Sequence, residues 1–211
     1  MQEFIQLLRT AFVAKYFHLF FLLTPFFVFS VFLTMTENST DTTRRKLATE
    51  IALGASCVEL AMFLGGAWLM SLFGITVDAF RAGSGVLLLL CAVSLVYGQD
   101  TKNTTAFRND AELLKNAVVP LAVPITAGPA TLGTMIVMGL EHTTIPEKLL
   151  TCLAIVCATW TVGLMLFFAI PLARIIGRAN IAILSKITGL ILSAIAVSMI
   201  VVGVRALWMA Q

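Results

Sequence analysis

The sequence has little charge and few of the side chains that catalysis or metal binding requires. Only 12% of its 211 residues are charged, and its two histidines are His18 and His142. It lacks a Ser–His–Asp set, an H-E-x-x-H motif, a glycine-rich phosphate loop and paired carboxylates. The net charge of +3 is too small to indicate nucleic-acid binding. We therefore expect a protein that is not an enzyme, with no cofactor, no bound metal and no nucleic-acid partner.

Cysteine is also scarce, and the four cysteines do not form a ligand pattern. All four lie within apolar runs, and Cys152 and Cys157 are five positions apart, which does not place them on one helical face at i, i+4. We interpret them as small packing residues rather than as disulfide partners or metal ligands.

Apolar residues are abundant by contrast. They make up 59% of the chain, and the mean hydropathy is +0.98, which is typical of a polytopic protein in a lipid bilayer. Each apolar run is long enough to cross a hydrocarbon core of about 30 Å as a helix. The sequence predicts an all-α bundle of six transmembrane helices in one domain, residues 1–211. The predicted spans are 16–35, 49–72, 79–98, 116–140, 148–172 and 184–208.

The basic residues predict an orientation. Nine of the 14 lysines and arginines lie in or beside the first, third and fifth loops, namely Arg44, Arg45, Lys46, Lys102, Arg108, Lys115, Arg174, Arg178 and Lys186. An excess of basic residues is typical of cytoplasmic loops. We therefore expect these loops in the cytoplasm and both termini on the outer side of the membrane, which is the periplasmic side if the bacterial inner-membrane location implied by the family resemblance below applies.

One predicted span, residues 116–140, holds an unusual concentration of residues that interrupt helices. The stretch Val119–Gly133 reads VPLAVPITAGPATLG and contains three prolines, the last of which follows Gly128. Proline has no backbone N–H to donate, and proline at the first helical position is typical of a helix start. A broken main chain inside a bilayer persists only against protein or a wet cavity. We predict that one helix ends near Thr126 and that another begins at Pro129.

A helix that begins at Pro129 would direct the free amides of Ala130 and Thr131 into the bundle. Such a positive helix end is suited to a carboxylate or another anion. The alternative is a kinked helix whose backbone is satisfied by Thr126, Thr131 and neighbouring spans. The candidate substrate-binding residues of this stretch are Pro124, Thr126, Gly128, Pro129, Ala130 and Thr131.

The two halves of the chain resemble each other when one is shifted by about 104 residues, the separation of Gly85 and Gly189. The same shift places the AVS of residues 92–94 on the AVS of residues 196–198, and Pro25 on Pro129. Three spans in each half, an odd number, imply that the halves are inverted relative to each other. We predict two inverted repeats, roughly 1–106 and 107–211, with interrupted first and fourth helices. Secondary transporters often place their substrate at such a repeat interface.

The repeat also draws attention to Thr24 and Pro25, near the middle of the first predicted span. In the functional interpretation, they form the second interrupted helix and belong to the candidate substrate site. The alternative is a lone kink, since only one proline is present and the phenylalanines around it suit lipid or core packing.

Glu59 is the one acidic residue deep inside a predicted span. An ionisable group there costs roughly 2.5–3.5 kcal/mol on insertion scales, so it should face the interior and have a partner. One hypothesis is a site that couples transport to a proton or a cation. The alternatives are a protonated glutamate bonded to a hydroxyl such as that of Ser56, and a shallow glutamate beside a wet cavity.

Three segments carry a family resemblance: VPLAVPITAGPATL, FGITVDAFRAGSG, and Ile187–Leu190 with the alanine-rich run that follows. They resemble motifs of the MarC (UPF0056-type) family of bacterial inner-membrane proteins. The resemblance implies a six-span membrane protein related in architecture to small amino-acid exporters. It also has departures. Thr24, Phe27 and Ser30 stand where the family's Asn-Pro-x-Gly-x-x-Pro motif has Asn, Gly and the second Pro, and Ser84 replaces the first Gly of FRIAGG.

Together, these features predict a secondary transporter or exporter of a small solute, and the resemblance favours a neutral amino acid. Alternating access would rock the two inverted halves about their helix breaks. The alternative is a non-transporting membrane scaffold or regulator that keeps the fold, which the altered Thr24–Ser30 motif favours. An ion channel ranks last because the sequence shows no ring of charge. A homo-oligomer is compatible with the sequence, which does not specify the oligomeric state.

Overall fold

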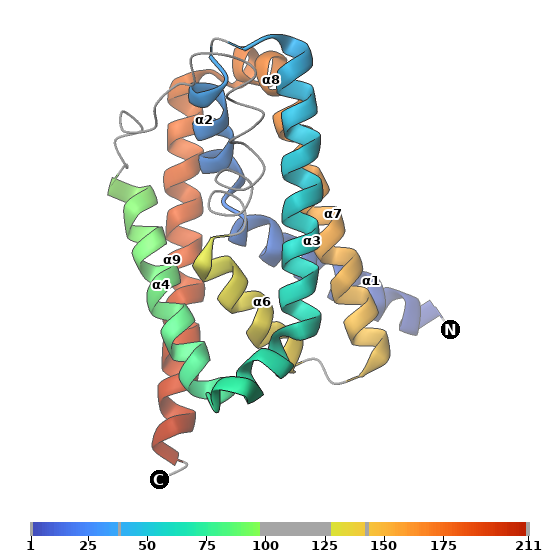
Figure 1. The fold of residues 1–211 in the computed structure, drawn as a ribbon, viewed down its shortest axis with the longest axis vertical. Helices are drawn as coiled ribbons and strands as arrows, with labels where there is room; N and C mark the ends of the chain where they lie inside the picture. Colours follow the sequence, from blue (N-terminus) through green and yellow to red (C-terminus); the bar gives the residue numbers. More distant parts are fainter. Residues whose placement is uncertain (1, 38, 98–127, 142–143, 210–211) are drawn as a thin grey trace.

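The computed structural model describes residues 2–37, 39–97, 128–141 and 144–209, and these ranges are mostly helical (Figure 1). Most of the predicted fourth span precedes Gly128 and lies outside the described residues. The helices are α1 (Gln2–Leu22), α2 (Pro25–Met35), α3 (Asp41–Phe73), α4 (Val77–Tyr97), α6 (Pro129–Glu141), α7 (Ile145–Phe167), α8 (Ala169–Ile176) and α9 (Arg178–Met209).

The helices form a bundle of membrane-spanning length. Four of them, α3, α4, α7 and α9, are long and apolar enough to cross a bilayer. Residues Thr10–Leu22 of α1 together with α2 pass the same test as a fifth, bent span, and α6 is a shorter apolar helix. The structure therefore agrees with the predicted all-α membrane bundle and contains up to five spans in the described residues.

Apolar side chains cover the outside of this bundle, while polar ones lie within it. Leu53, Leu64, Leu90 and Leu190 are 60–61% exposed on the long helices, whereas Glu59 and several threonines are buried. An outer surface with this much exposed leucine is suited to lipid rather than to water.

Two helix ends differ from the predicted spans for identifiable reasons. Helix α3 begins at Asp41, earlier than the predicted residue 49, because the Thr40 side chain caps a polar first turn by accepting from the Thr43 N–H. Helix α7 ends at Phe167, before the predicted residue 172. Pro171 lacks the N–H that would bond to the Phe167 carbonyl in a continuous helix, so the chain restarts as α8.

Glycines allow α4 and α9 to pack closely as antiparallel neighbours (Figure 1). A Cβ added to Gly85 on α4 would lie 3.0 Å from the Ala196 carbonyl oxygen and 2.8 Å from Ile200. A Cβ added to Gly189 on α9 would lie 2.9 Å from the Ala92 carbonyl oxygen. Small residues at helix contacts are typical of membrane bundles, where close backbone approach supplies the packing.

Candidate functional site

The first helix of the bundle is broken at Thr24–Pro25, as the sequence predicts. Helices α1 and α2 meet there at a bend of 41°. Pro25 has no N–H for the Phe21 carbonyl, which accepts instead from the Thr24 amide at 3.0 Å. Thr24 has φ 48° and ψ 54°, the left-handed conformation, which is unusual for a β-branched residue. The break is thus a sharp local structure rather than a gentle kink.

A second helix start lies at Gly128–Pro129. Helix α6 begins at Pro129, and the Leu132 amide donates to the Gly128 carbonyl at 2.9 Å as the first bond of that helix. The amides of Ala130 and Thr131 fall in the first turn, where an N–H has no acceptor within its own helix. Both residues are buried, with exposed fractions of 3% and 6%. This agrees with the predicted helix start at Pro129, while Pro124 and Thr126 lie outside the described residues.

The structure brings the break in the first helix and the start of α6 together. The Thr131 hydroxyl donates to the Leu22 carbonyl at 3.5 Å, a long hydrogen bond across 109 positions of sequence. In an unbroken helix that carbonyl would accept from the Phe26 amide, so the end of α1 leaves it free for Thr131. In Figure 1, α2 rises and α6 descends from the middle of the bundle. The positive ends of two oppositely directed helices therefore lie next to each other in the interior.

Glu59 is fully buried on α3, and its partner is on α7. The Thr159 hydroxyl donates to its Oε2 at 2.6 Å, and Thr159 is only 1% exposed. The Ser56 hydroxyl, named above as a candidate partner, donates instead to the Ala52 carbonyl of its own helix at 2.8 Å. Within the described part of the chain, Glu59 Oε1 has no hydrogen-bond partner, and no bond joins this carboxyl to Thr24–Pro25 or to the start of α6. Glu59 therefore forms a separate polar centre, with spare acceptor capacity.

A cavity of about 160 Å³ lies along α6, on the side toward which α6 descends. It runs past Thr134, one turn beyond Thr131, to an ion pair in which Arg81 on α4 meets Glu141 at the end of α6. Arg81 also pairs with Asp78 at 3.4 Å, and its side chain is 14% exposed. The remaining lining residues are His18, Val137, Met138, Ser198, Met199 and Val202.

The sequence did not predict these partners. Thr159 is 100 positions from Glu59, and Glu141 is 60 positions from Arg81. No spacing rule links residues so far apart, because their proximity depends on how α3 packs on α7 and α4 packs on α6. For Thr134 the sequence offered one indication of a place in the site, since this residue lies in the second turn of the helix predicted to begin at Pro129.

Comparison with known proteins identifies the family. The model of the MarC family integral membrane protein matches residues 9–208. A UPF0056 membrane protein of Methanocaldococcus jannaschii is 37% identical over 92% of this chain and 96% of its own. A UPF0056 membrane protein of Aquifex aeolicus is 30% identical over 93% of each chain, and YhcE of Escherichia coli is 29% identical over 90% of each. No solved structure matches. With a match over nearly its whole length, the chain belongs to the MarC family of integral membrane proteins.

Proposed function

We propose that this protein is a secondary transporter of a small solute with a carboxylate or another anionic group, such as a neutral amino acid. The observation that carries the proposal is the meeting of the two helix starts, at Pro25 and Pro129, through the Thr131–Leu22 contact. Oriented first-turn amides inside a bilayer favour an anion there, and transporters with inverted repeats use discontinuous helices in this way.

Contacts between α4 and α9 support the inverted repeats that alternating access requires. With a shift of 104 residues, Gly85 corresponds to Gly189, Ala92 to Ala196 and Val96 to Ile200. Gly85 packs against Ala196 and Ile200, while Gly189 packs against Ala92 and Val96. The two contacts are therefore the same contact with the halves exchanged, which is the expected property of a pseudo-two-fold axis between the helices.

Two cavities suggest the route of the solute. The cavity along α6 extends from Thr134 to the Arg81–Glu141 pair, so Thr134 marks its end nearer to the helix starts. A second cavity, of about 180 Å³, is lined by Ser30 and Thr34 on α2 and by Ile181 on α9. Helices α2 and α6 run in opposite directions from the middle of the bundle (Figure 1). The buried helix starts thus separate a cavity at one end from a cavity at the other. In our proposal, rocking of the two halves opens the helix starts to each cavity in turn.

Two groups would control this cycle. The Arg81–Glu141 pair joins α4 to α6 in the lining of the α6 cavity and would have to part when that side opens. Glu59, with one carboxyl oxygen unpaired among the described residues, would exchange a proton or a cation and so couple the solute to an ion gradient.

The test is counterflow of labelled L-alanine into liposomes that contain the purified protein and unlabelled L-alanine. Gly128→Leu places a large side chain at the start of α6 and should abolish uptake. Glu59→Gln should remove any dependence on an imposed pH or sodium gradient. Gly65→Leu is the matched control, because among the described residues no neighbouring element lies within 4 Å of a Cβ at that position. Unchanged uptake in both site variants would reject this assignment of the site.

A second candidate function is a membrane scaffold or regulator that keeps the fold without transport. The altered motif favours it, because Phe27 and Ser30 occupy α2 positions where the family motif has Gly and Pro. This candidate predicts no counterflow with any of the twenty amino acids, together with stable co-purification of another membrane protein under conditions in which the bundle is folded.

A further inference from the structure

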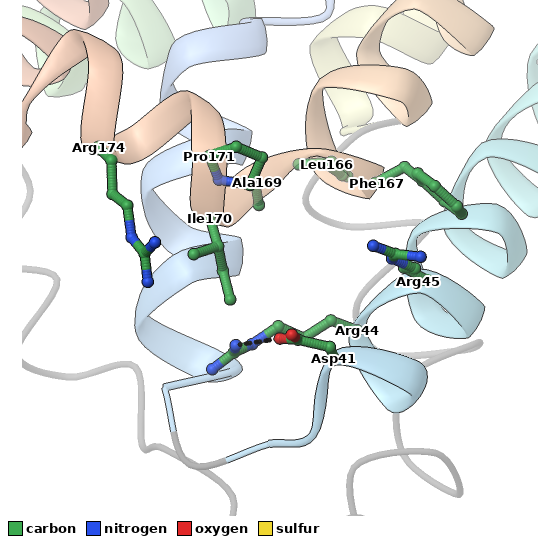
Figure 2. Close-up of a pocket in the computed structure, with 9 residues that line it drawn as sticks. All are labelled: Asp41, Arg44, Arg45, Leu166, Phe167, Ala169, Ile170, Pro171 and Arg174. Carbon is green, nitrogen blue, oxygen red and sulfur yellow. Dashed lines mark hydrogen bonds and ion pairs between the residues drawn. The ribbon is translucent and has the colours of Figure 1, made fainter.

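A basic cavity lies at the end of the bundle where α7 passes into α8. Its volume is about 240 Å³, and it is lined by residues of α3, α7 and α8 (Figure 2). Three of the lining residues are arginines, Arg44, Arg45 and Arg174, while Asp41 is the only acidic one. The cavity therefore has a formal excess of positive charge, and neither the helix breaks nor Glu59 contributes to it.

The three arginines are held differently. The Arg44 guanidinium is already bound within the protein, since it pairs with Asp41 at 3.2 Å and donates to the carbonyls of Thr36 and Glu37. The Arg45 guanidinium lies 5.2 Å from the centre of the Phe167 ring, which orients it without using its N–H groups. Among the described residues, neither Arg45 nor Arg174 has a carboxylate partner. Two guanidinium groups thus remain available to an anion.

The residues around the cavity have the composition expected at a membrane surface. Helix α8 presents Arg174 beside Ile175, which is 82% exposed, and Phe168 before it is 50% exposed. An apolar surface next to basic residues is typical of helices at the boundary between headgroups and acyl chains. This is also the end of the bundle that the distribution of lysine and arginine predicts to be cytoplasmic, where anionic phospholipids attract basic segments.

We propose that this cavity binds a phosphate group, presented either by the headgroup of an anionic phospholipid or by a small phosphate compound. Arginine suits a phosphate because its planar fork can donate two parallel hydrogen bonds to the phosphate oxygens. Arg45 and Arg174 lie on opposite sides of the group of lining residues, and the fixed Arg44 lies between them in this view (Figure 2). A phosphate between them would receive charge-assisted bonds from two helices and so link α3 to α8. The proposal does not depend on transport.

The test is a titration of the detergent-purified protein with phosphatidylglycerol, followed by native mass spectrometry, with phosphatidylcholine as the neutral lipid. A basic residue near an anionic membrane surface changes affinity by about fivefold. Arg174→Gln should therefore weaken phosphatidylglycerol binding about fivefold, and the Arg45→Gln/Arg174→Gln double variant about twentyfold or more. The matched control is Lys148→Gln/Arg205→Gln, which removes two positive charges at the opposite end of the bundle and should leave the affinity within about twofold.

Competition identifies the source of the phosphate. Displacement of phosphatidylglycerol by millimolar glycerol 1-phosphate, in the wild type but not in the double variant, would support the site and assign it to a small phosphate compound. Failure of displacement, with the arginine dependence intact, would support the site and assign it to the lipid. The single variant Arg174→Gln keeps the test valid if the double variant does not fold, because Arg174 is exposed. Wild-type affinity in the folded variants, or an equal loss in the control, would overturn the proposal.

Discussion

The contact between Glu59 and Thr159 provides a direct test of how the interior of this bundle is held together. Thr159→Val removes the only hydroxyl that donates to the Glu59 carboxyl among the described residues, and it keeps the shape of the side chain. Since Glu59 is fully buried, the carboxyl cannot recover the lost bond from bulk water. A buried polar group left without its partner destabilises the folded state.

The magnitude follows from the membrane environment. Hydrogen bonds to charged groups contribute about 1.5–3 kcal/mol in soluble proteins, whereas double-mutant cycles in a membrane bundle average about 0.6 and reach about 1.7 kcal/mol. The Thr159–Glu59 distance is 2.6 Å and both residues are buried, so we expect the upper end of the membrane range, about 1.5 kcal/mol. Glu59→Leu should lower the free energy of unfolding by less than Thr159→Val does. The first variant removes the buried carboxyl, whereas the second leaves it in place without its hydrogen-bond donor.

The assay is unfolding in mixed micelles by increasing fractions of sodium dodecyl sulfate, on the wild type, both single variants and Glu59→Leu/Thr159→Val. The double variant should be no less stable than Thr159→Val alone. The matched control is Thr188→Val, since among the described residues the buried Thr188 hydroxyl bonds to the Leu184 carbonyl of its own helix, at 3.0 Å, and to no other group. A coupling energy below about 0.3 kcal/mol, or a control that loses as much stability as Thr159→Val, would refute the reasoning.

Three further outcomes are expected. Gly85→Leu should destabilise the protein by about 1–3 kcal/mol in the same unfolding assay, because its side chain would enter α9, whereas Gly65→Leu should have little effect. Arg81→Gln should lower the melting temperature more than Glu141→Gln, since the Arg81 side chain is 14% exposed and that of Glu141 is 47% exposed; equal effects would contradict this. Thr24→Asn should raise stability by up to about 1 kcal/mol, because asparagine tolerates the left-handed conformation better than a β-branched residue; a decrease would argue against strain at this position.

Local chemistry explains which parts of the fold could be predicted from the sequence. The helix break at Pro25 and the helix start at Pro129 follow from the local chemistry of proline and need no knowledge of neighbouring helices. The end of α7 at Phe167 has the same origin in Pro171, and the rule would have found it if the apolar run had not continued past it. Hydropathy alone therefore overestimated the length of the fifth span.

Tertiary packing explains what could not be predicted. Burial predicted that Glu59 needs a partner, and a hydroxyl was the right kind of partner, but the sequence suggested Ser56 on the same helix. The actual donor, Thr159, lies 100 positions away on α7. Small residues make that approach possible, since a Cβ at Gly163 would lie 2.5 Å from the Ala52 side chain. The sequence shows these small residues but not which helices they join.

The break at Thr24–Pro25 and the helix start at Pro129 explain each other in a way that neither explains alone. A single break at Thr24–Pro25 would leave the Leu22 carbonyl without a donor, which costs several kcal/mol in hydrocarbon. Thr131 supplies the donor, and it can do so because α6 begins two residues earlier, where its first turn faces the end of α1. A lone kink, the alternative for the first span, would have no need of a second helix start at this contact. The contact between this break and the start of α6 therefore favours one shared structure in the middle of the bundle, built from both halves of the chain.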